Sequence, residues 1–189
     1  MPEGGGLWEA CLVVAAAGWW GGTTSTIARV GLGGGGPLLL EACSALSLVD
    51  VPDSSPGAEP ARAALSTCYD LRFPELYRAQ LDAGATLFVI PAAWPAARVR
   101  HWTLLAHARA IENQCVVVAC NTAGTHAGME MGGHSQVVLP TGDVAAVAGS
   151  EEAVLSVEID MGVVGDYRTS FPVLRDRRLP PVVWPAHLT

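Results

Sequence analysis

Residues 63–75 read AALSTCYDLRFPE, an apolar run followed by a cysteine, a polar turn and a proline. The run at residues 63–67 predicts a strand that ends at Cys68. Pro74 is favoured at the first position of a helix, Glu75 suits the first turn, and Gly84 lies just past the expected end. The sequence therefore predicts a strand, a turn that carries Cys68, and a helix that ends before Gly84.

Beyond this turn the chain continues as apolar runs that alternate with longer helical stretches. We expect strands at residues 86–91, 115–120, 135–139 and 154–159, and a helix over residues 96–114. Strands separated by helical stretches of this length are typical of an α/β fold.

The first 60 residues differ in kind from the rest. They hold 12 of the 21 glycines and a single basic residue, Arg29. A strand at residues 12–17 and a helix at 38–46 are the best predictions there, and residues 51–60 indicate a loop. The glycines at 31–36 also fit the dinucleotide pattern G-x-G-x-x-G, although a low-complexity loop explains them better. We predict a poorly specified segment over residues 1–60 and the folded domain over residues 61–189.

Composition excludes several classes of protein. The apolar runs are far shorter than the ~20 residues that a membrane span needs, so we expect no contact with a membrane. A net charge of -7 argues against binding of nucleic acid. No basic region precedes an apolar stretch at the start, which favours a cytoplasmic location. The five cysteines lack metal-ligand spacing, and we expect neither a metal nor another cofactor.

Cys68 is the first candidate for chemistry. A cysteine between a strand end and a helix start meets backbone N–H groups and the positive end of the helix dipole, which favour the thiolate. The same donors could stabilise an oxyanion. Cys68 could equally be a buried apolar residue, and its position alone leaves both interpretations open. Ligands of α/β sheets bind at the carboxyl ends of the strands, where Trp94 and Asn121 are also expected.

The segment CYDLRFPE at residues 68–75 resembles the nucleophile segment of the nitrilase superfamily of carbon–nitrogen hydrolases. Further similar blocks follow in the same order, over about two thirds of the chain: PAAW at 91–94, HW at 101–102, ARAIEN at 108–113, Asn121, GHS at 133–135 and FPVL at 171–174. The omega-amidase-like and Nit-type branches are the most similar. The resemblance implies an αββα sandwich, here incomplete at the N-terminus, that often forms a homodimer.

The resemblance also implies a reaction and a set of site residues. The reaction is hydrolysis of a small-molecule amide or nitrile through a thioester or thioimidate on Cys68. Tyr69, Trp94 and Asn121 would contact the substrate or the oxyanion, and Trp94 could alternatively be a core residue. Arg72 and Glu75 would shape the site, and we expect them to form a local ion pair.

Two further catalytic residues of the family, a glutamate base and a lysine, lie upstream of its cysteine. This chain has no lysine, because all 11 of its basic residues are arginine. Glu41 is the candidate base, and Arg62 is the nearest upstream cation, although a guanidinium does not replace an ammonium ion. His101 or His134 could serve Cys68 as a base in a cysteine-protease arrangement. We therefore expect impaired activity, and the alternative is an inactive truncated or frameshifted fragment or a pseudoenzyme retained for association.

Overall fold

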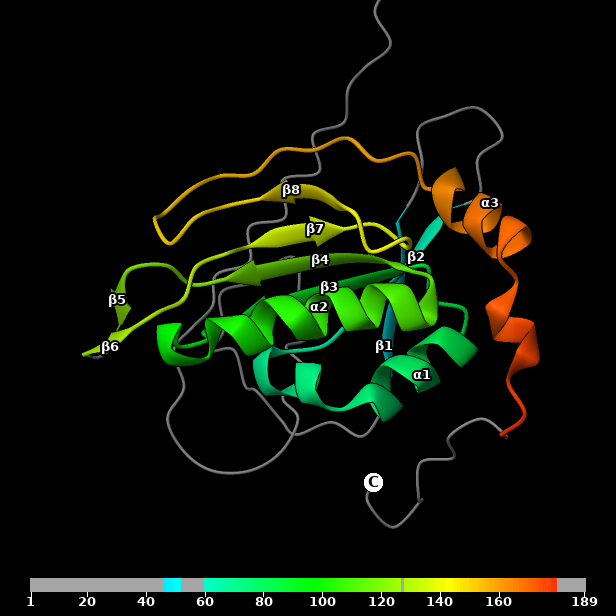
Figure 1. The fold of residues 1–189 in the computed structure, drawn as a ribbon, viewed down its shortest axis with the longest axis horizontal. Helices are drawn as coiled ribbons and strands as arrows, with labels where there is room; N and C mark the ends of the chain where they lie inside the picture. Colours follow the sequence, from blue (N-terminus) through cyan, green and yellow to red (C-terminus); the bar gives the residue numbers. More distant parts are fainter. Residues whose placement is uncertain (1–45, 52–59, 127, 180–189) are drawn as a thin grey trace, which may run out of the picture.

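The computed structural model describes residues 46–51, 60–126 and 128–179. A six-stranded sheet forms its centre, and helices α1 and α2 lie side by side over one face (Figure 1). The strands are β1 (Ser47–Val51), β2 (Ala61–Leu65), β3 (Leu87–Ala92), β4 (Val116–Asn121), β7 (Gln136–Val138) and β8 (Val144–Val147). The helices are α1 (Pro74–Asp82), α2 (Val99–Asn113) and α3 (Gly162–Ser170).

The sheet is mixed, with the order β1-β2-β3-β4-β7-β8. Its three central strands β2, β3 and β4 are parallel, whereas β1, β7 and β8 each pair antiparallel to their neighbours. A separate hairpin joins β5 (Thr125–His126) to β6 (Met129–Glu130). Helices connect the parallel strands, as the crossover between such strands requires. The prediction of an α/β fold is confirmed.

The predicted turn and helix around Cys68 are present. A 3₁₀ helix, η1 (Cys68–Arg72), follows β2 directly, and α1 then begins with Pro74 at its first position. Helix α1 ends at Asp82, and Gly84 adopts a φ of +94°, the left-handed conformation that glycine favours after a helix. The local sequence signals therefore placed this segment correctly, although they did not show η1.

The main hydrophobic core lies between α1, α2 and the sheet. Residues alternate between the two faces along each strand, so Phe88 and Ile90 of β3 face the helices. They pack there with Tyr77 of α1 and Trp102 of α2, and all four side chains are fully buried. A smaller cluster of Val116, Val137 and Val164 packs α3 against the opposite face. Burial of this apolar surface is the main stabilising contribution to the fold.

Several sequence-based assignments were wrong or incomplete. Residues 154–159 form no strand, and Val154 is 92% exposed, because a strand needs a hydrogen-bonded neighbour that an alternating pattern cannot supply. The sheet instead ends at β8, which we did not predict. Strand β1 lies inside the segment 1–60 and pairs with β2, so residues 47–51 belong to the sheet. The predicted strand at 12–17 and nearly all of the predicted helix at 38–46 lie outside the described residues.

Candidate active site

Cys68 lies in a strained turn at the carboxyl end of β2. Its φ is +45°, a conformation that costs a non-glycine residue of order 1–3 kcal/mol. The side chain of Asp70 holds the turn by accepting a hydrogen bond from the Thr67 backbone N–H at 2.9 Å. The backbone N–H of Asp70 in turn donates to Thr67 O at 2.9 Å. The turn thus places a half-buried thiol between a strand end and the first turn of η1.

The surroundings of the thiol favour its protonated form. Burial is the main cause that raises the pKa of Cys68 above its usual value, and the charge of Asp70 adds to this effect. Backbone hydrogen bonding at Ala93 and Tyr69 and the charge of Arg72 lower the pKa, but less. The sequence had led us to expect a thiolate-favouring position. Desolvation outweighs that effect here, because Cys68 begins a short 3₁₀ helix and α1 starts only at Pro74.

Arg72 stacks between aromatic rings instead of pairing with Glu75. Its guanidinium carbon lies 4.6 Å from the ring centroid of Trp94 and 5.5 Å from that of Tyr69. Such contacts stabilise a guanidinium by about 0.5–2 kcal/mol each. Glu75 is exposed, and the ion pairs within the described ranges do not include Arg72 with Glu75. The predicted ion pair was therefore wrong, although a role of both residues in shaping the site stays a prediction.

Tyr69 and Trp94 both contact the guanidinium of Arg72 but differ in exposure. Tyr69 is 64% exposed and contacts the ring of Phe73 edge-on, with the centroids 5.5 Å apart. Trp94 is buried, and its indole Nε1–H donates to Arg98 O at 2.8 Å. Tyr69 is therefore open to a ligand, whereas Trp94 is a core residue that meets the site through the guanidinium stacked on it.

Asn121, the last residue of β4, uses its whole side-chain amide on backbone groups. Its Oδ1 accepts a hydrogen bond from Trp94 N at 2.6 Å, while its Nδ2 donates to Trp94 O at 3.2 Å and to Gly133 O at 2.7 Å. The residue is only 6% exposed. Contact of its amide with a substrate or an oxyanion stays a prediction, and it would require exchange of one of these bonds.

The loop at residues 131–135 is hydrogen-bonded to the segments that follow β3 and end β4. Gly132 N donates to Trp94 O at 2.8 Å, and the indole N–H of Trp102 donates to His134 O at 2.9 Å. Gly133 has a φ of +56°, and a Cβ there would lie 2.6 Å from Gly149 O, so only glycine fits. His134 bonds through Nδ1 to Gly132 O at 2.7 Å, and the contacts found for Cys68 include neither His134 nor His101.

Comparison with known proteins now adds to this geometry. Residues 5–169 match the sequence model of the Carbon-nitrogen hydrolase family. The chain belongs to the carbon–nitrogen hydrolase family. The match begins within the segment 1–60 that our sequence analysis left outside the resemblance, and the domain boundary at residue 60 stays a prediction.

Relatives place this carbon–nitrogen hydrolase in the omega-amidase-like branch. It is 43% identical over 172 residues to the 2-oxoglutaramate amidase of Paenarthrobacter nicotinovorans, a match that covers 91% of this chain and 58% of the relative. It is 46% identical over 111 residues to the 2-oxoglutaramate amidase of Bacillus subtilis, with 59% and 43% covered. The chain therefore spans about half the length of the curated relatives it matches.

Solved structures agree with this assignment. The crystal structure of Saccharomyces cerevisiae Nit3, a member of branch 10 of the nitrilase superfamily, superposes with a TM-score of 0.64 at 31% identity. The superposition covers 74% of this chain and 50% of Nit3. The superfamily, the branch and the nitrilase-type sandwich fold predicted from the sequence are confirmed.

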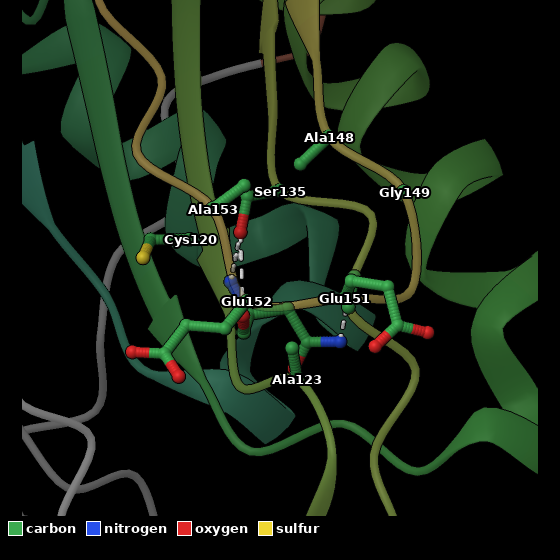
Figure 2. Close-up of a pocket in the computed structure, with 10 residues that line it drawn as sticks. Cys120, Ala123, Ser135, Ala148, Gly149, Glu151, Glu152 and Ala153 are labelled. Carbon is green, nitrogen blue, oxygen red and sulfur yellow. Dashed lines mark hydrogen bonds between the residues drawn. The ribbon is translucent and has the colours of Figure 1, made fainter.

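A pocket of about 100 Å³ opens at Asn121 (Figure 2). Its lining includes Cys120, Asn121 and Ser135, and the Ser135 hydroxyl is hydrogen-bonded to the backbone of Asn121. Figure 2 shows the carboxylates of Glu151 and Glu152 pointing in different directions. Cys68 does not line this pocket, so the pocket is not the surroundings of the candidate nucleophile.

Of the upstream partners that we considered for Cys68, only Arg62 belongs to the part of the chain that the structure describes, and it does not lie beside the thiol. Glu41, our candidate base, lies outside the described residues. Arg62 is exposed near the start of β2, where it lies 3.7 Å from Asp50 and beside Gly84, at the opposite end of the strand from Cys68. Among residues 46–51, 60–126 and 128–179, no three metal-binding side chains gather. Within the same ranges no helix is long and apolar enough to cross a membrane.

Proposed function

We propose that this chain carries the nucleophile of an amidase that acts on small-molecule amides. The Cys68 sulfur attacks the carbonyl carbon, the C–N bond breaks, and protonated nitrogen leaves as ammonia, so that a thioester remains on Cys68. Water then cleaves the thioester and restores the thiol. The observation that carries the proposal is the position of Cys68: a half-buried thiol in a strained turn at the carboxyl end of a parallel strand.

The names of the relatives favour amides over nitriles as substrates. The 2-oxoglutaramate amidase of Paenarthrobacter nicotinovorans is similar to 91% of this chain, and that of Bacillus subtilis to 59%. A monoamide of a dicarboxylic acid is therefore the substrate to test first. The exposed ring of Tyr69 and the stacked guanidinium of Arg72 are the groups nearest to the thiol that could contact its acyl part.

We further propose that this chain alone catalyses only the first half of the reaction, and only with activated substrates. Attack on an amide places negative charge on oxygen, and the family meets that charge with a lysine that this chain lacks. Loss of a preorganised donor typically costs ~10²–10³ in rate. Loss of a general base costs about 10²–10⁴ more. An ester with a nitrophenolate leaving group needs no protonation, whereas an amide nitrogen does.

A second candidate function is non-catalytic. The raised pKa of Cys68 and the lack of lysine both favour an inactive fragment, or a pseudoenzyme that acts by association. In either case we propose a cytoplasmic homodimer, which the resemblance and the composition led us to expect. Light scattering of the purified chain would test the dimer, and cell fractionation would test the location.

Acylation by p-nitrophenyl acetate tests the catalytic proposal. We expect a slow release of one nitrophenolate per chain, an acetyl group on Cys68 in the mass spectrum, and loss of both in Cys68→Ser. Cys120→Ser is the matched control, because Cys120 is also half-buried, and it should acylate normally. Unmodified Cys68 after prolonged incubation would contradict the proposal and support the non-catalytic candidate. Rapid hydrolysis of 2-oxoglutaramate that depends on Cys68 would instead contradict the limit to activated substrates.

A further inference from the structure

A single peptide group links Cys68 to Asn121. The peptide bond between Ala93 and Trp94 carries the carbonyl of Ala93 and the N–H of Trp94, and no peptide bond among the described residues is cis. In a trans peptide these two groups point in opposite directions. The Cys68 Sγ lies 3.9 Å from Ala93 O on one side, and Asn121 Oδ1 lies 2.6 Å from Trp94 N on the other. A displacement of the amide of Asn121 therefore moves the backbone that faces the thiol.

This peptide needs an external hold because it lies beyond the regular sheet. Strand β3 ends at Ala92, and beyond it Gly132 N donates a backbone hydrogen bond to Trp94 O at 2.8 Å. Asn121 adds to this hold, because it bonds to the carbonyl of Trp94 and also to its N–H. Its remaining bond, to Gly133 O, ties the same amide to the loop at 131–135. Irregular backbone of this kind is held in place only where its polar groups have such partners.

We infer that Asn121 is a positioning residue for Cys68: its side-chain amide fixes the Ala93–Trp94 peptide against the nucleophile and does not itself contact the substrate. The inference rests on the proposed role of Cys68 as nucleophile. It also replaces the contact with substrate or oxyanion that the sequence led us to expect for Asn121. Because every polar atom of this amide is bonded to backbone, a substrate could reach it only after the strand ends separate.

The charges that act on the thiol come from its own turn. Asp70 and Arg72 are the groups whose charges affect Cys68, with opposite signs, and both belong to η1. Asn121 is neutral and lies on β4, so its removal leaves these two charges unaltered. A change in the titration of the thiol on removal of the amide would then report displacement of the backbone at Ala93, whose carbonyl oxygen faces the Cys68 sulfur at 3.9 Å.

The pH profile of Cys68 alkylation by iodoacetamide, followed by mass spectrometry, provides the test. Asn121→Leu keeps the size of the side chain and removes the amide. We expect it to shift the midpoint by about half a pH unit or more, roughly a threefold change in the rate below the midpoint. Gln114→Met is the control, since it removes a fully buried amide before the amino end of β4, where it bonds Phe171 O, and it should leave the midpoint unchanged. Equal midpoints in folded Asn121→Leu and wild type would overturn the inference.

A second measurement needs no substitution of Asn121. In the unaltered chain, the side-chain amide signals of Asn121 in ¹⁵N NMR spectra should shift with the same midpoint as the alkylation. That shift should vanish in Cys68→Ser. Amide signals that stay constant through the titration of the thiol would overturn the inference even if Asn121→Leu fails to fold. Neither measurement requires hydrolysis, so a failure of the proposed amidase activity would appear separately, in the nitrophenyl ester assay.

Discussion

The cysteines at the two ends of the parallel strands differ in burial and in their neighbouring charges. At the carboxyl end, Cys68 is half-buried in a strained turn, between the charges of Asp70 and Arg72. At the amino end, Cys115 immediately precedes β4 and is fully buried. Burial there raises the pKa of Cys115 to about 12, although the neighbouring guanidinium of Arg168 lowers it in part. Two thiols in one domain thus differ in burial and in the charges around them.

The same two ends also differ in how their loose backbone is held. At the amino end, Arg168 of α3 donates hydrogen bonds to the carbonyls of Ala85, Asn113 and Gln114, and also to the Cys115 sulfur at 3.1 Å. This side chain covers the end of the strands. At the carboxyl end, the neutral amide of Asn121 holds the backbone and leaves the thiol in part accessible. Arg168 thus acts as a clamp that covers the amino end, whereas Asn121, as inferred above, positions a reactive group at the carboxyl end.

The largest expected effect is on thiol reactivity. A thiol with a pKa of about 12 is ionised in about one molecule in 10⁴ at pH 8, and full burial slows Cys115 further. We expect iodoacetamide to label Cys68 at least roughly a hundredfold faster than Cys115 in the folded protein. Mass spectrometry of the peptides after brief treatment measures this ratio. Preferential labelling of Cys115 or Cys120 would contradict the expected reactivity of Cys68.

The next effect concerns the clamp at the amino end. Arg168→Met removes the donor for three backbone carbonyls, and we expect the free energy of unfolding to fall by about 2–4 kcal/mol. Urea denaturation followed by circular dichroism measures it. Arg175→Met is the matched control, since the exposed side chain of Arg175 makes none of these contacts, and it should change stability by less than about 0.5 kcal/mol. Equal effects of the two variants would show that Arg168 is not a clamp.

The pH dependence of stability should reveal the buried thiol. The pKa of Cys115 rises from an ordinary 9.0 to about 12 on folding, so the unfolded chain releases this proton first. Its contribution is complete below pH 9 and is lost as the pH rises toward 12. We expect wild type to lose stability more steeply than Cys115→Ser in this range, by up to about 1.4 kcal/mol per pH unit. Tyr77, whose pKa is also raised, is common to both proteins.

Parallel slopes of wild type and Cys115→Ser would contradict this expectation. Cys120→Ser controls for the loss of a half-buried thiol and should retain the steep wild-type slope. Chemical denaturation at several pH values above 9, under reducing conditions, gives the comparison.

The smallest expected effect on stability comes from an ion pair near the amino end of the parallel strands. Arg177 donates two hydrogen bonds to the carboxylate of Asp82, at 2.6 and 2.9 Å, and these bonds lower the pKa of Asp82. We expect Arg177→Gln to destabilise the protein by less than about 1 kcal/mol at neutral pH, because water and salt screen the pair. The difference from wild type should vanish in acid, since a lowered pKa stabilises only above that pKa. Thermal unfolding at pH 7 and at about pH 2, well below the ordinary pKa of 3.8, would measure both, and an undiminished difference in acid would exclude this ion pair as its cause.

Local signals explain which parts of the site were predictable. Pro74 and Gly84 mark the two ends of α1 in the sequence, and the apolar run before Cys68 marks β2, so the turn that carries the thiol was foreseen. The roles of its neighbours were harder to predict. The spacing of Arg72 and Glu75 predicted an ion pair, but in the structure the guanidinium lies over the buried ring of Trp94 instead.

The family, the α/β class and the turn that carries Cys68 were predictable from the sequence, because motifs and caps consist of residues that are close along the chain. That Asn121 holds the backbone of Trp94 became visible only in the folded structure, since these residues are 27 positions apart. The same holds for Arg168 and Cys115, which are 53 positions apart, and for β8 as the edge strand in place of residues 154–159. Periodicity and caps record the local conformation of the chain. Hydrogen bonds and burial between distant segments depend on which strands meet, and that is fixed only when the sheet assembles.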